Sequence, residues 1–67
     1  MHTTYAHFGE YAFTVWGKGV SCLLERYGRS VYWQGDEAAE ITDRVDEEGA
    51  SVLPHIWSEY EHIAEED

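Results

Sequence analysis

The stretch from residue 36 to residue 48 places seven carboxylates beside a single basic residue, Arg44. Its apolar residues Ala38, Ile41 and Val45 recur at helical spacing, which puts them on one face and leaves the acids for the others. This spacing predicts an amphipathic helix over residues 36–48. Its apolar face must rest on a core that the rest of the chain supplies.

The ends of this helix carry their own signals. Asp36 follows Gly35 and stands in N-cap position, where a carboxylate accepts hydrogen bonds from the first free amides. Glu37 and Glu40 complement the positive end of the helix dipole. Gly49 is typical of the residue that stops a helix.

A second helix is predicted over residues 54–65. Pro54 suits the first turn of a helix, and Ser51 is a possible cap. The segment carries an apolar stripe spaced three and four residues apart. The residues of this stripe are Leu53, Ile56, Trp57, Tyr60, Ile63 and Ala64.

The first half of the chain favours strands. Residues 11–16 (YAFTVW) and 29–34 (RSVYWQ) are rich in β-branched and aromatic side chains, and glycine turns follow them. We expect these two segments to pair antiparallel. Residues 20–27 suit either a third strand, which would give a meander and is slightly favoured, or a short helix. Residues 1–10 have no firm period.

Together these elements predict one acidic α+β domain over residues 1–67. Its small antiparallel sheet, of two or three strands, would pack with two or three α-helices. Trp57, Tyr60 and Ile63 would face the sheet. The sheet residues opposite them would be Phe13, Val15, Val31 and Trp33.

Ten aromatic residues in 67 make a folded chain plausible, because each large ring buries on the order of 150–250 Å². No segment approaches the roughly 20 apolar residues of a membrane span, and no export signal is recognisable. Cys22 has no second cysteine to pair with. We therefore expect no membrane association and a reducing cytoplasm, with Cys22 as a small buried hydrophobe.

The charge is divided unevenly between the two halves. Residues 36–67 hold twelve acids against Arg44, a formal charge of −11, whereas residues 1–35 have a formal charge of +1. Such an asymmetry indicates a directed electrostatic surface. It also opposes direct binding of nucleic acid, because phosphate contacts require a cationic surface.

On a helix, Asp36, Glu40, Asp43 and Glu47 lie along one stripe. Eleven residues rise roughly 16 Å, so the stripe carries roughly one charge per 4 Å. A single DNA strand carries a phosphate per about 3.4 Å, and these densities are close. The plainer interpretation is a solvated face that keeps a small protein soluble.

Catalytic and metal sites are weakly indicated. His55, Glu59, His62 and Glu66 are spaced four, three and four residues apart, but one helix usually supplies only two ligands, and no second cluster completes a site. Exposed histidines beside acids are the simpler interpretation. The GKG turn lacks the spacing of a phosphate-binding loop, and a core of this size leaves little room for a catalytic pocket. We expect no enzymatic activity, no cofactor and no metal.

A family resemblance rests on YAFTVWGKGVSCLLERYGRSVYWQGDEAAEI, strands and turn running into an acidic helix, followed by LPHIWSEYEHIAEED. In size, charge and order of elements, the chain resembles the small acidic phage anti-CRISPR proteins, most of all inhibitors of the type I-C system. Some members of that group imitate DNA and occupy the basic groove for the target duplex, often on the subunit that reads the protospacer-adjacent motif.

The resemblance implies a monomeric inhibitor in the cytoplasm of a host bacterium. Its partner would be a type I CRISPR-Cas effector subunit or another basic nucleic-acid-binding protein. The expected partner-binding residues are Asp36, Glu37, Glu40, Asp43, Asp46, Glu47, Glu48 and Glu59. The alternative is an acidic interaction module of a phage or mobile element, related to antirestriction proteins or antitoxins, whose charge serves mainly solubility.

Overall fold

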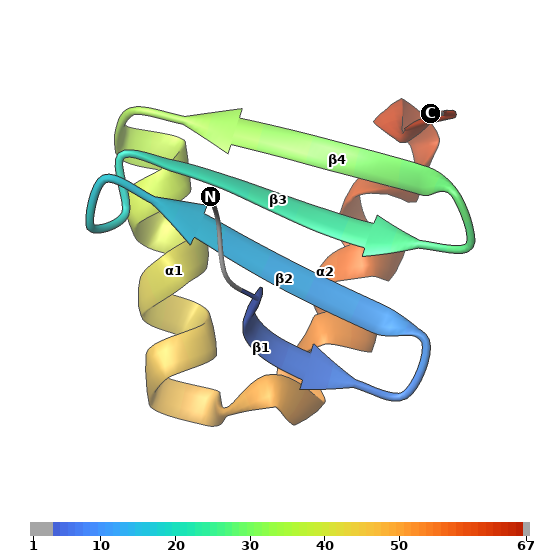
Figure 1. Ribbon diagram of the computed structural model, residues 1–67, viewed down its shortest axis with the longest axis horizontal. Helices are drawn as coiled ribbons and strands as arrows, with labels where there is room; N and C mark the ends of the chain where they lie inside the picture. Colours follow the sequence, from blue (N-terminus) through green and yellow to red (C-terminus); the bar gives the residue numbers. More distant parts are fainter. Residues whose placement is uncertain (1–3, 67) are drawn as a thin grey trace.

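The computed structural model describes residues 4–66, which form a five-stranded antiparallel sheet with two α-helices. The elements are β1 (Thr4–Phe8), β2 (Tyr11–Trp16), β3 (Ser21–Arg26), β4 (Arg29–Gln34), α1 (Asp36–Glu48), η1 (Ala50–Val52), α2 (Leu53–Tyr60), η2 (Glu61–Ile63) and β5 (Glu65–Glu66). The strands lie in the order β1-β2-β3-β4-β5 (Figure 1). Short turns join β1 to β2, β2 to β3 and β3 to β4, whereas the segment from α1 to η2 connects β4 to β5.

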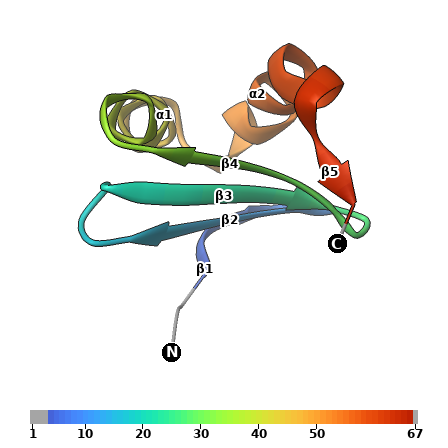
Figure 2. The ribbon, with the colours of Figure 1, turned by 90° about the horizontal axis from the view of Figure 1, so that it is seen from above.

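Both helices cover the same face of the sheet, and the opposite face carries no helix (Figure 2). Successive side chains of a strand alternate between the two faces, and the cross-strand partners Phe13, Leu24 and Val31 face the helices. The core forms where these strand residues meet the apolar faces of α1 and α2. Its fully buried members include Phe13, Cys22, Leu24, Ala38, Leu53 and Ile56.

The α+β class is confirmed, but the predicted number of strands was too small. The structure adds β1, from the segment without a period, and β5, whose first residue Glu65 had been assigned to the second helix. The open choice for residues 20–27 resolves as strand β3. The bounds 11–16 and 29–34 match β2 and β4, but their predicted pairing was wrong because β3 lies between them. Since β3 is antiparallel to both, β2 and β4 run in the same direction.

Helix α1 has the predicted bounds, and its N-cap residue is Gly35 rather than Asp36. Gly35 has φ 66° and ψ −139°, a region of backbone space that side chains other than hydrogen rarely allow. This conformation turns the chain from the edge of the sheet directly into the helix. The prediction of Gly49 as the residue that stops α1 is confirmed, and its amide bonds to the carbonyl of Val45.

Helix α2 is shorter than the predicted segment 54–65. It begins at Leu53 with Pro54 in its first turn, as expected, but its N-cap is Val52, not Ser51. It ends at Tyr60, and η2 then turns the chain into β5. Ile63 consequently leaves the core stripe and is 52% exposed. The predicted core role of Ile63 was therefore wrong, while Trp57 is buried as expected.

Candidate functional site

Helix α1 turns its acids away from the core. Its buried residues are Ala38, Ile41, Thr42 and Val45. At about 100° per residue, Asp36, Glu40, Asp43 and Glu47 fall within about 60° of one another, in the direction opposite to this buried face. All four are exposed. The structure therefore brings together on one surface the four carboxylates of the predicted stripe.

Two more carboxylates widen this stripe. Glu37 and Glu48 are exposed on the flank of α1 toward Arg44. We call these six of the seven exposed acids of α1 the acidic ridge, which comprises Asp36, Glu37, Glu40, Asp43, Glu47 and Glu48. The ridge extends over about 18 Å of helix axis, or roughly one carboxylate per 3 Å.

The remaining two predicted partner-binding residues are engaged within the protein. Glu59 accepts two hydrogen bonds from Arg44, at 3.1 and 2.8 Å, and also lies 3.1 Å from His55 Nε2. The Arg44 guanidinium holds the pKa of Glu59 below its usual value. Asp46 accepts a hydrogen bond from the hydroxyl of Tyr5, and this bond raises the pKa of the phenol.

Arg44, the only basic residue of α1, is directed toward α2 by its contact with Glu59. Within residues 4–66, this is the only ion pair that includes a residue of α1. The guanidinium of Arg44 is therefore paired with a carboxylate outside the ridge, although it lies on the same flank of α1 as Glu37 and Glu48. The local spacing of the sequence does not reveal this arrangement, because Arg44 and Glu59 lie 15 positions apart on different helices.

The predicted histidine and carboxylate spacing is not realised as one face. Helix α2 ends at Tyr60, so His62 and Glu66 lie beyond it. Across the described part of the chain, no three His, Cys, Asp or Glu side chains are placed to hold a metal ion.

Cys22 is buried, and its thiol lies 3.8 Å from the carbonyl oxygen of Ala38. Burial raises the pKa of this thiol to about 11. At neutral pH the group is therefore a protonated, weakly reactive thiol. Cys22 acts as a small core residue, as its apolar sequence neighbours indicated.

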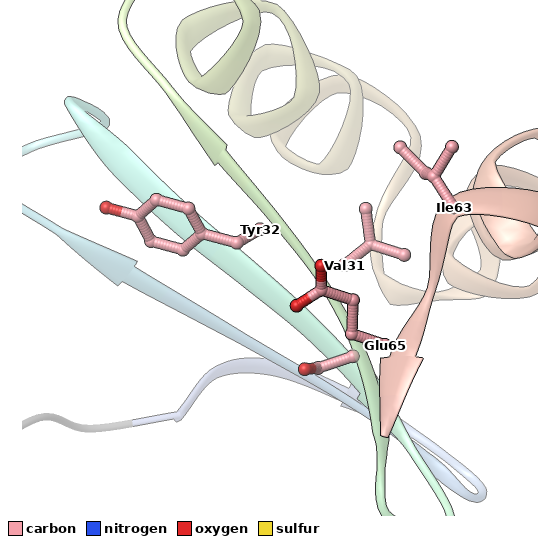
Figure 3. A pocket seen from close by; sticks show the side chains of 5 residues that line it. Val31, Tyr32, Ile63 and Glu65 are labelled. Carbon is pink, nitrogen blue, oxygen red and sulfur yellow. The ribbon is translucent and has the colours of Figure 1, made fainter. Parts of the chain in front are cut away.

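The surface of the described chain includes two hollows. One, of about 310 Å³, lies between α1 and the strands and is lined in part by Tyr5, Lys18, Asp43 and Asp46. The other, of about 410 Å³, lies at the outer edge of β4, beside Ile63 and Glu65 (Figure 3). Sequence reasoning missed both, because each joins segments that are far apart in the chain.

No protein-family model, no curated protein and no solved structure was found to match the chain. Among residues 4–66, no helix has the length and apolar character needed to cross a membrane.

Proposed function

We propose that this protein is an anti-CRISPR inhibitor that acts as an acidic DNA mimic. It binds a cationic DNA-binding groove of a type I CRISPR-Cas surveillance complex and blocks recognition of target DNA. The acidic ridge of α1 is the observation that carries the proposal. The choice of a type I effector, and of its large subunit that reads the protospacer-adjacent motif, rests on the family resemblance in sequence.

The spacing of the ridge supports mimicry. Its six carboxylates give roughly one charge per 3 Å of helix axis, and one DNA strand has a phosphate per about 3.4 Å. A groove lined with lysine and arginine for a phosphate strand therefore meets a similar linear charge density on α1. Like charges at this spacing cost the helix some stability, and binding to a cationic groove removes that repulsion.

The ridge is also held in place before binding. Four residues of α1 are buried against the core, and the Arg44–Glu59 ion pair ties the helix to α2. A surface that is already ordered loses little conformational entropy on association. Acids on an unanchored segment would have to be ordered at the moment of binding.

The proposal is tested by competition between this protein and target DNA for the effector complex. Glu40→Lys with Glu47→Lys reverses two ridge charges, and we expect it to weaken competition by about tenfold or more. Glu61→Lys with Glu66→Lys is the matched control, because it changes the net charge equally on exposed residues outside the ridge. The control should compete much more like the wild type.

Salt provides the second arm of this experiment. Competition by the wild type should fall steeply as ionic strength rises, since charge pairing at an exposed surface is screened. Melting curves establish that both double variants are folded. If the ridge variant is folded and blocks DNA as well as the wild type at low and at high salt, mimicry is wrong.

The alternative function, an interaction module that binds through an apolar patch, also has an observation in its favour. The face of the sheet without helices carries Tyr32, 54% exposed, next to Trp16 at a ring distance of 6.4 Å. A partner bound on this face would be insensitive to salt and to the ridge variant. Tyr32→Ala would then be the change that weakens binding.

A further inference from the structure

The outer edge of β4 is only partly covered. Strand β5 pairs with Arg29 and Ser30 at the beginning of β4. Beyond that point, within residues 4–66, no strand pairs with the outer side of residues 31–34. Figure 2 shows β5 meeting β4 near one end only. An uncovered edge of this kind is a template for a further strand.

The turn before β4 determines which main-chain groups face outward. Tyr27 and Gly28 form a two-residue turn with φ 47° and 78°, which is typical of a type I′ hairpin. In such a turn the N–H of Arg29 bonds to the carbonyl of Arg26. Hydrogen-bonded and non-bonded pairs alternate along antiparallel strands, so Tyr32 directs its N–H and C=O outward.

The same alternation applies to the rest of the strand. Val31 and Trp33 bond to their partners in β3, whereas Gln34, like Tyr32, presents its N–H and C=O to the outer side. Ser30 belongs to this outward set, and it is the residue that pairs with Glu65 of β5. Tyr32 and Gln34 therefore extend the row of outward main-chain groups that begins at Ser30, and no strand of the described chain pairs with these two residues.

A hollow beside this open edge has room for side chains of an added strand. The hollow of about 410 Å³ lies beside it, with Val31 and Ile63 on the helix side and Tyr32 pointing to the opposite side of the strand (Figure 3). Side chains of an added strand alternate in the same way. One set would enter the hollow between Val31 and Ile63, and the other would lie beside Tyr32.

The charges at the two ends of this edge indicate which kind of strand can bind to it. Residues 31–34 are uncharged, but Glu65 and Glu66 lie at one end of the edge and Asp36 and Glu37 follow the other. A second copy paired antiparallel at this edge would bring the acids of one end close to those of the other. Like charges in this position are destabilising. A strand with basic residues would instead be attracted at both ends.

We propose that the outer edge of β4 binds an extended, basic segment of another protein as an added antiparallel strand. Aliphatic side chains of that segment fill the hollow, and its lysines or arginines lie near the flanking carboxylates. This mode of recognition combines main-chain hydrogen bonds with pockets for alternate side chains. It goes beyond the proposed function, because its main contacts are the main chain of β4 and the hollow beside it, and it shares only Asp36 and Glu37 with the ridge.

The first measurement is amide hydrogen exchange of the free protein at low concentration. The amides of Tyr32 and Gln34 should exchange faster than those of Val31 and Trp33, which bond to β3. A labelled octapeptide of alternating lysine and valine is then added. Bound peptide should slow exchange at Tyr32 and Gln34 and leave Val31 and Trp33 unchanged.

Two controls separate strand pairing from charge attraction. The same peptide with alternate N-methylated amides keeps its charge and loses its donors, so it should bind about tenfold more weakly. Gln34→Pro removes an outward N–H without removing a bond to β3, and should weaken peptide binding by about the same factor. Gln34→Ala keeps the N–H and should bind like the wild type.

Three outcomes overturn the proposal. In the first, the amide of Tyr32 is already protected in the free monomer. In the second, protection of Tyr32 rises with protein concentration alone, which makes a second copy the occupant. In the third, the N-methylated peptide binds as well as its parent. Each leaves the ridge proposal standing, since Glu40→Lys with Glu47→Lys does not alter this edge.

Discussion

Arg44 of α1 and Glu59 of α2 form a two-bond ion pair, with Nη1–Oε1 and Nη2–Oε2 distances of 3.1 and 2.8 Å. The pair joins the two helices on the same face of the sheet. It also pairs the one cation of α1 with a carboxylate outside the acidic ridge. Within residues 4–66, the six ridge carboxylates consequently have no ion pair.

The Arg44–Glu59 pair makes stability depend on pH in the acid range. The pKa of Glu59 is lowered in the folded protein by the hydrogen bonds from Arg44. Its contribution is therefore complete above its unfolded pKa of about 4.3, and is lost as pH falls through the lowered folded value. Glu59→Gln should destabilise the protein at neutral pH and differ little from the wild type in strong acid.

Urea unfolding of the wild type and Glu59→Gln at several pH values checks this prediction. Glu61→Gln is the control, since the Glu61 carboxylate has no salt bridge to any of residues 4–66. If the free energy of unfolding of Glu59→Gln stayed below that of the wild type by the same amount down to strong acid, the effect would not come from the ion pair with Arg44.

Trp57 should be a major stabilising residue. It is 2% exposed, packs edge-on against Tyr11 at 6.3 Å, and lies under the guanidinium of Arg29. Trp57→Ala should cost about 3–5 kcal/mol, enough to unfold most of so small a domain. Ile63→Ala should cost far less, because Ile63 is half exposed.

Trp57→Phe separates packing from hydrogen bonding. The indole N–H of Trp57 is buried without a partner among the described residues. Phenylalanine retains a ring and removes that unpaired donor, so it should cost much less than alanine. Melting curves rank the variants by stability. An equal loss of stability for Trp57→Phe and Trp57→Ala would contradict this explanation.

Cys22 should report on unfolding. Because burial raises the pKa of its thiol to about 11, iodoacetamide should modify it slowly at pH about 8 in the folded protein and rapidly in urea. A raised folded pKa also means that stability is complete below the unfolded value of about 8.5 and declines as pH rises toward 11. Cys22→Ala should reduce this alkaline decline. Rapid labelling of the native protein would show instead that the thiol is accessible.

Gly28 should be required by the turn between β3 and β4. Its φ is 78°, and no heavy atom lies within 4 Å of the position that a Cβ would take. Gly28→Ala should therefore cost about 1–2 kcal/mol through backbone strain alone. A synthetic chain with D-alanine at this position should be at least as stable as the wild type. Equal effects of the two enantiomers in thermal unfolding would contradict the strain explanation.

Several features were determined by local sequence. The bounds of α1 follow from Ala38, Ile41 and Val45 at helical spacing, ended by Gly49. The same spacing places the stripe of Asp36, Glu40, Asp43 and Glu47 opposite the core. The bounds of β2 and β4 follow from β-branched and aromatic runs ended by glycine. These signals act over a few residues, so the sequence alone reveals them.

Other features were decided only by the tertiary structure. The helical period continues through Ile63, yet the chain leaves the helix after Tyr60 because Glu65 and Glu66 pair with β4. The place of β3, the partner of Arg44 and the open edge at Tyr32 depend on contacts between distant segments. The periodicity of apolar residues predicts which face of a helix or strand is apolar. It does not predict which other helix or strand covers that face, because strand pairing and burial depend on how all the segments pack into one small core.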